Sequence, residues 1–194
     1  MKNKSTQQDS SRVATAIIFY NRWVVRAAWA LSLIAAGVTL LIAALLISDM
    51  LAREVGGKPL NAVYETVRLS MVAVVFLAIG YAEHTESHIR IEALTERLKG
   101  RPLAVLRTIG LTIGLIASAM FTVATFMRAV SSTQIHESVQ GLIIFPIWPS
   151  RWLIVIGFVM LTLVFIGKVA TCVRTIITGG EDLAKPPLKL EEMV

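Results

Sequence analysis

Two charged side chains lie inside an otherwise apolar stretch of this 194-residue chain. Glu65 and Arg68 are three residues apart, so on a helix they share one face and are close enough to pair. Charges within a membrane-spanning helix are costly, and they mark a functional site or a buried contact by default. No other apolar stretch carries a carboxylate that would extend a proton or ion relay. We therefore expect Glu65 and Arg68 to form a structural pair that orients this helix against a partner.

His84 and His88 have the i, i+4 spacing that would let two imidazole rings bind one metal ion, with Glu86 and Glu92 nearby. The order His-Glu-x-x-His of zinc hydrolases is absent, and no histidine lies in an uncharged stretch where it would ligate haem. The single cysteine, Cys172, has no partner for a disulfide or a dithiol reaction. No phosphate-binding loop or nucleophile elbow occurs either. We predict no metal site, no cofactor and no enzymatic activity.

Four hydrophobic stretches are long enough to cross a bilayer, at residues 27–48, 60–82, 108–127 and 151–173. The first has 22 uncharged residues. At about 1.5 Å per residue it matches a hydrocarbon core of roughly 30 Å. The chain is 55% hydrophobic and only 16% charged, a composition typical of integral membrane proteins. The sequence therefore predicts an all-α membrane protein with four transmembrane helices.

The polar segment after the second stretch has its own helical pattern. Ile91, Leu94 and Leu98 recur at three- and four-residue steps, and charged residues fill most other positions. We predict a cytoplasmic amphipathic helix at the membrane interface between transmembrane helices 2 and 3. Near the end of the fourth stretch, Lys168 is expected to snorkel toward the headgroups. Gly110 and Gly114 form a Gly-x-x-x-Gly pattern that permits close approach of a neighbouring helix.

These elements divide the chain into three parts. Residues 1–26 are predicted to be a polar N-terminal tail, disordered at 1–12, followed by an interfacial lead-in. Residues 27–178 form the four-helix transmembrane domain, and residues 179–194 a short cytoplasmic tail. The loop before the fourth helix ends in an apolar run at 142–148, which should be buried against its own helices, lipid or another subunit.

Basic residues indicate the orientation in the membrane. Of the 19 Lys and Arg residues, five lie in the N-terminal segment, five between the second and third spans, and four at the C-terminal end. The first loop with the adjoining start of the second span carries three, and the third loop carries two. Because short basic loops stay in the cytoplasm, both termini and the central loop are predicted to be cytoplasmic. Topology and membrane lipid thus account for the net charge of +6, and nucleic acid is not an expected partner.

Several short patterns occur in a fixed order around the second span. An arginine follows the first span, a Glu-x-x-Arg opens the second, and His-Ile-Arg-Ile-Glu lies beyond it, followed by a short Leu-containing stretch. A serine, an apolar run and Pro-x-Trp precede the fourth span, and a glycine lies within it. The residues concerned are Arg53, Glu65, Arg68, His88, Arg90, Glu92, Leu94, Leu98, Ser138, Pro146, Trp148 and Gly157.

In this order and spacing, over residues 47–167, the chain resembles the small membrane subunit (DctQ-like) of tripartite ATP-independent periplasmic (TRAP) transporters. The resemblance implies a bacterial cytoplasmic (inner) membrane protein and a secondary, sodium-coupled transporter of organic acids. It further implies two protein partners, a large permease that carries substrate and ions and an extracytoplasmic substrate-binding protein. The small subunit would brace the permease and help dock the binding protein. Arg53, Glu65, Arg68, His88, Arg90, Glu92, Pro146 and Trp148 become candidate interface or structural residues.

Two other classes of function stay open from the residues alone. A stand-alone proton-coupled four-helix carrier would use Glu65 as its titrating group. A membrane anchor of a redox complex would need haem or quinone ligands. The genes that flank this one would separate these alternatives from a small transporter subunit.

Overall fold

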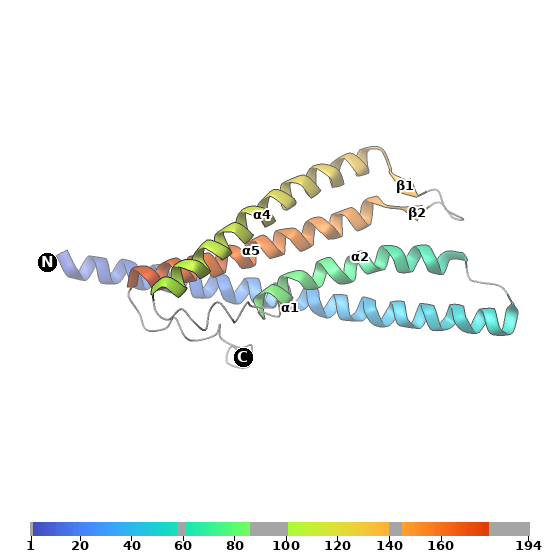
Figure 1. The fold of residues 1–194 in the computed structure, drawn as a ribbon, viewed down its shortest axis with the longest axis horizontal. Coiled ribbons are helices and arrows are strands. Elements are labelled where there is room, and N and C mark those ends of the chain that lie inside the picture. The colour runs from blue at the N-terminus through green and yellow to red at the C-terminus, as the bar shows by residue number, and fades with distance from the viewer. Residues whose placement is uncertain (1, 58–60, 86–100, 140–144, 179–194) are drawn as a thin grey trace.

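A computed structural model describes residues 2–57, 61–85, 101–139 and 145–178 of the chain. Helix α1 (Lys2–Gly56) is followed by α2 (Asn61–His84), α4 (Arg101–Gln134) and α5 (Trp148–Thr178), with the short strands β1 (Ser138–Val139) and β2 (Phe145–Pro146) between the last two helices. Figure 1 shows these four long helices in one elongated assembly. The predicted amphipathic helix at the central polar segment lies outside the described residues and stays a prediction.

All four predicted transmembrane helices are present. Each contains a segment long and apolar enough to cross a membrane, at Ile17–Gly56, Val63–His84, Thr108–Gln134 and Trp148–Val173. The helices nevertheless run past the predicted ends of 27–48, 108–127 and 151–173. Hydrophobicity marks where a helix crosses lipid, whereas the helix itself continues through flanking polar residues that also favour helical backbone.

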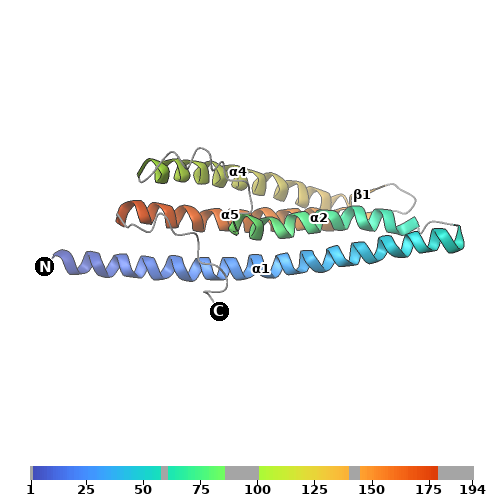
Figure 2. The same ribbon diagram turned by 60° about the horizontal axis from the view of Figure 1, so that its bottom comes forward.

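Helix α1 is the clearest departure from the sequence-based prediction. The prediction of disorder at 1–12 is wrong for residues 2–12, which continue the helix that crosses the membrane. That segment contains no Gly or Pro, and extending an existing helix needs no new nucleus. At its other end α1 continues past the predicted span 27–48 and ends at Gly56. The next residue, Gly57, has a positive φ of 63°, and its N–H donates to the Arg53 carbonyl, which makes a left-handed cap. Figure 2 shows α1 reaching past the ends of the other helices.

The four helices form an open layer rather than a closed bundle. Helix α5 packs against α4 on one side and α2 on the other, and α1 packs mainly against α2 and also against α5, so α4 lies at one edge and the order is α4–α5–α2–α1 (Figure 1). Of the 18 most apolar consecutive residues in each helix, only 6% are buried in α1 and in α4, compared with 22% in α2 and 28% in α5. Both faces of the layer therefore present apolar side chains outward.

Small residues allow the two central helices to approach closely. A Cβ on Gly157 of α5 would overlap the Phe76 carbonyl oxygen of α2 and lie 2.8 Å from the Phe76 carbonyl carbon and Cβ. Beside this contact, the ring of Phe158 lies between those of Phe76 and Phe121, 5.4 Å from each centroid. A row of aromatic rings thus ties α2, α5 and α4 together.

The Gly-x-x-x-Gly pattern has only part of the predicted role. Gly114 lies against the Phe165 ring of α5, where an added Cβ would be 2.8 Å from two ring carbons, whereas Gly110 has no atom within 4 Å of such a Cβ. The glycines that approach a neighbouring backbone, Gly157 and Gly80, lie in the central pair of helices. At these glycines, close approach to a neighbouring backbone therefore occurs between α2 and α5, whereas Gly114 of α4 accommodates an aromatic ring of α5.

Helix α4 ends in a turn that leads into the two-stranded ribbon. His136 adopts a left-handed conformation (φ 48°), its backbone N–H donates to the Thr133 carbonyl, and the Glu137 N–H donates to the Ser132 carbonyl. This pair of bonds is the Schellman motif, which satisfies carbonyls at a helix end. The ribbon pairs Ser138 with Pro146 in antiparallel register. It returns the chain directly to the start of α5.

Candidate functional site

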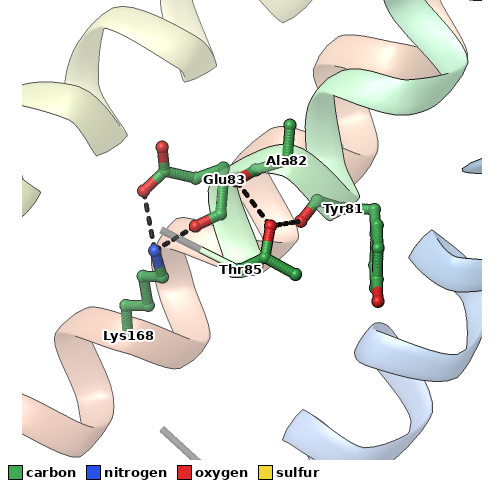
Figure 3. Close-up of polar contacts among 5 residues, drawn as sticks. All are labelled: Tyr81, Ala82, Glu83, Thr85 and Lys168. Carbon is green, nitrogen blue, oxygen red and sulfur yellow. Dashed lines mark hydrogen bonds and ion pairs between the residues drawn. The ribbon is translucent and has the colours of Figure 1, made fainter. Parts of the chain in front are cut away.

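A polar belt joins three helices at the end of the layer where α2 stops and α5 nears its C-terminus. Lys168 of α5 donates to the Glu83 carboxylate at 2.8 Å and to the Glu83 backbone carbonyl. Both side chains are only 15% exposed. Figure 3 shows the ammonium between these two oxygens, with the Thr85 hydroxyl donating to the carbonyls of Tyr81 and Ala82.

Lys168 therefore caps helix α2 from a neighbouring helix. The carbonyls of the last turn of a helix have no partner within it, and that end carries partial negative charge. The Lys168 ammonium gives the Glu83 carbonyl a hydrogen-bond donor and places positive charge at the negative end of α2. It also neutralises the adjacent Glu83 carboxylate. The structure holds the Lys168 ammonium between α2 and α5, and its expected snorkelling toward the headgroups stays a prediction.

Helix α1 joins the same belt through two uncharged side chains. The Tyr20 hydroxyl donates to the Leu163 carbonyl at 3.1 Å, and the Asn21 amide donates to the Thr171 hydroxyl at 3.2 Å. Gly167 makes room for this contact, since a Cβ there would overlap the Asn21 side-chain oxygen. The belt fixes both the depth and the rotation of α1 against α5.

The opposite end of the layer is held by a second set of polar contacts. Arg151 of α5 pairs with Glu137 at 2.7 Å, and the Trp152 indole N–H donates to the Thr133 hydroxyl at 3.1 Å. Ser132 is only 1% exposed, and its hydroxyl has no hydrogen-bond partner among the described residues. These contacts lock α4, the turn after it and α5 into one unit.

The candidate residues on α1 and α2 are placed near this second end. Arg53 pairs with Asp49 one turn earlier, at 2.8 Å. Glu65 is half-buried and Arg68 is exposed, and no ion pair between them is found within the described residues. The predicted Glu65–Arg68 pair is therefore not formed. Spacing places the two side chains within reach, but it does not decide which contact each side chain makes.

The remaining candidates divide into two groups. Pro146 lies in β2 and Trp148 opens α5, and both are exposed at the end that carries the ribbon. His88, Arg90 and Glu92 lie outside the described residues, so their roles stay predictions. In the part of the chain that the structure describes, no group of three or more His, Cys, Asp or Glu side chains could hold a metal ion.

Sequence reasoning did not identify the polar contacts between helices. Lys168 was interpreted only as a snorkelling residue near the end of the fourth span, and neither Glu83 nor Glu137 was singled out. A usable signal was present, because an acid and a base at the ends of two spans on the same side of the membrane are natural partners. Which spans are neighbours, however, depends on the order of helices in the layer.

Comparison with protein-family models identifies the chain. The model of the DctQ component of tripartite ATP-independent periplasmic transporters matches residues 42–175. The chain belongs to this family. The match extends from α1 to α5 and confirms the resemblance drawn from the sequence motifs. No curated protein and no solved structure matches the chain.

Family membership decides the broad function. The chain is a small subunit of a TRAP transporter, a class that is not enzymatic, and it is a multi-pass protein of the inner membrane. TRAP systems of this family also contain a large permease and a binding protein, which are therefore its partners. A stand-alone carrier or a redox anchor is not favoured by this match.

Proposed function

We propose that this subunit braces the large permease of a sodium-coupled organic-acid transporter and does not itself carry substrate. The observation that supports this role most directly is the open layer of helices. Helix α4 packs mainly against α5, and α1, α2 and α5 pack directly on one another, so the four described helices do not surround a central space. They offer two broad apolar faces instead, which suits a part that lies against a larger membrane protein.

The distribution of charge supports the same role. Each helix contains a stretch without Asp, Glu, Lys or Arg, at residues 27–48, 69–82, 108–127 and 152–167, so Glu65, Arg68 and Lys168 lie toward the ends of their spans. Transport sites for organic acids and sodium need polar groups or interrupted helices near the bilayer midplane. Here the ion pairs between separate parts of the described fold lie toward the two ends of the layer, and the Thr122 and Thr162 hydroxyls, 3.1 Å apart, join α4 to α5 between those ends. They hold helices in place rather than line a pathway.

One face of α2 is a candidate contact with the permease. Tyr64, Arg68, Met71 and Val75 are exposed at four-, three- and four-residue steps, so they form one stripe along the helix. A guanidinium on a lipid-facing stripe is costly unless an acceptor covers it. We propose that the permease supplies this acceptor to Arg68, with half-buried Glu65 beside it.

The other candidates extend this proposal to the ends of the layer. Arg53 is proposed to support the turn between α1 and α2. Exposed Pro146 and Trp148 are proposed to contact the permease or help dock the binding protein. His88, Arg90 and Glu92 are proposed to contact the permease from the cytoplasmic side.

The bracing role predicts that transport depends on assembly. The subunit should co-purify with its large permease, and liposomes that hold the subunit alone should take up no organic acid under a sodium gradient. Addition of permease and binding protein should restore uptake. The Arg68→Ala variant should lower co-purification about tenfold, a factor that corresponds to about 1.4 kcal/mol.

Arg128 provides the matched control for that variant. It is also an exposed arginine, but it lies on α4, at the other edge of the layer from α1. Arg128→Ala should leave co-purification unchanged. Sodium-driven uptake by the isolated subunit would refute bracing as its function, and equal losses for the two arginine variants would remove α2 as the specific contact.

The proposed orientation, with both termini in the cytoplasm, predicts which turns react with an impermeant thiol reagent. In a Cys172→Ser background, Ser131→Cys on α4 should be labelled from outside intact cells, because Ser131 is exposed at the outer end. Thr85→Cys, exposed at the other end, should react only after the membrane is opened. Ser132 is unsuitable as a probe because it is buried. The reverse labelling pattern would invert the topology.

A further inference from the structure

An outward face of α1 combines two arginines with three aromatic rings. The exposed side chains of this face are Phe19, Arg22, Trp23, Arg26 and Trp29, and the exposed fraction of Trp23 is 59%. Their three- and four-residue steps place them on one side of the helix. The rings of Phe19 and Trp23 contact each other edge to face, with centroids 6.1 Å apart. These five residues are called the cationic–aromatic face below.

Contacts on the opposite side of α1 keep this face turned outward. Val24, Val25 and Ala28 are buried against the layer. Tyr20 and Asn21 add the hydrogen bonds to α5 described above. Helix α1 cannot rotate to hide its arginines without breaking these contacts.

The face lies at the depth of the lipid headgroups. Residues 27–48 are uncharged and fill roughly 33 Å at 1.5 Å per residue, about the thickness of the hydrocarbon core. Arg26 and Arg22 therefore lie just beyond it. The Lys168–Glu83 pair, in the polar belt that also holds Tyr20 and Asn21, marks the same level on α2 and α5.

The chemistry of the face favours a negatively charged lipid. Helix α1 contains no Asp or Glu between Asp9 and Asp49, so the helix itself offers no carboxylate near Arg26. Guanidinium groups bind phosphate through paired hydrogen bonds, and Trp rings prefer the membrane interface. A zwitterionic lipid neutralises its own phosphate, whereas an anionic lipid retains a net charge.

We propose that the cationic–aromatic face is a binding site for the headgroup of an anionic phospholipid. Arg26 binds the phosphate, Arg22 one turn away adds positive charge beside it, and the rings of Trp23 and Phe19 lie along the upper part of the acyl chain. An acidic segment of the permease is the competing occupant. The depth of the face and its three aromatic rings favour lipid over a protein segment.

Quenching of Trp23 fluorescence tests the proposal directly. A full-length variant with Trp23 as its sole tryptophan (Trp29→Phe, Trp148→Phe, Trp152→Phe) is reconstituted in phosphatidylcholine vesicles. These vesicles contain equal small fractions of brominated phosphatidylglycerol or brominated phosphatidylcholine. Brominated phosphatidylglycerol should quench more strongly. Arg26→Gln should reduce its enrichment about fivefold, the factor that corresponds to about 1 kcal/mol per basic residue at an anionic surface.

Two controls separate a specific site from general attraction. Arg26→Lys should keep most of the preference, and Arg128→Gln, a lost charge on α4, should leave it unchanged. If the Trp23-only variant does not fold, quenching is measured instead on the protein with all its native tryptophans. Phosphatidylglycerol added to detergent micelles should raise the thermal midpoint of the native protein but not of Arg26→Gln.

Three results would overturn the proposal. The first is equal quenching by the two brominated lipids. The second is an anionic preference that survives both Arg22→Gln and Arg26→Gln. The third is loss of phosphatidylglycerol quenching when the permease is co-reconstituted, which would show that a protein segment covers the face in the assembled transporter.

Discussion

Replacing Gly157 with alanine should lower the free energy of unfolding of this subunit by about 2–3 kcal/mol, within the range for overpacking a tight core. The added Cβ would overlap the Phe76 carbonyl oxygen and lie 2.8 Å from two further Phe76 atoms, the carbonyl carbon and Cβ. Two of these three are backbone atoms, so no side-chain rotation relieves the clash. Helices α2 and α5 must separate, which also disturbs the contact between Phe76 and Phe158.

Gly110→Ala is the matched control, because nothing lies within 4 Å of the Cβ position at Gly110. Alanine favours helix over glycine by about 1 kcal/mol, so this variant should be as stable as the native chain or slightly more stable. Unfolding in mixed detergent micelles, followed by circular dichroism, measures both. Similar effects of the two substitutions would contradict a tight α2–α5 contact at Gly157.

The membrane spans could be predicted from the sequence because they depend on composition alone. An apolar stretch such as 27–48 must cross lipid as a helix, whichever neighbours it later finds. The helix ends could not be predicted in the same way. Residues 2–12 are polar yet helical, and the end of α1 at Gly56 is set by the left-handed Gly57. Hydrophobicity gives no information on either boundary.

The contacts between helices depend on the order of the layer. Glu65 and Arg68 have suitable spacing within one helix, and spacing alone led to their predicted pairing. The ion pairs that link separate parts of the fold join Glu83 with Lys168 and Glu137 with Arg151 instead. Glu83 and Lys168 meet because α5 lies beside α2, which the pattern of a single sequence does not reveal. The two charges at the ends of their spans were nevertheless a visible clue.

Gly157 illustrates how a motif gains a physical explanation. In the sequence it was one loose element of a family resemblance. In the structure it is the point where α5 approaches the backbone of α2. The Gly110 position, which belongs to a more familiar packing pattern, faces open space. Recurrence of a small residue therefore identifies a close contact only when the neighbouring helix is known.

Loss of the Lys168 ammonium should destabilise the subunit by about 2 kcal/mol. Breaking a fully buried ion pair costs about 3–5 kcal/mol, and the 15% exposure of both side chains reduces that value. Lys168→Met keeps the length of the side chain but leaves the Glu83 carboxylate and the last-turn carbonyl of α2 without their cation. Fraying of α2 should follow, measured as faster amide hydrogen exchange at Tyr81–Glu83.

A second substitution separates the two roles of Lys168. In the double variant Lys168→Met/Glu83→Gln the uncompensated carboxylate is gone, so roughly half of the lost stability should return. The helix cap remains absent, because no ammonium group is left to donate to the backbone carbonyl of residue 83. Amide hydrogen exchange at the end of α2 should therefore stay fast. Glu83→Gln alone keeps the bond from Lys168 to the Glu83 carbonyl and should have the smallest effect. If Lys168→Met and the double variant were equally stable, the carboxylate would contribute nothing, and Lys168 would act on α2 only as its cap.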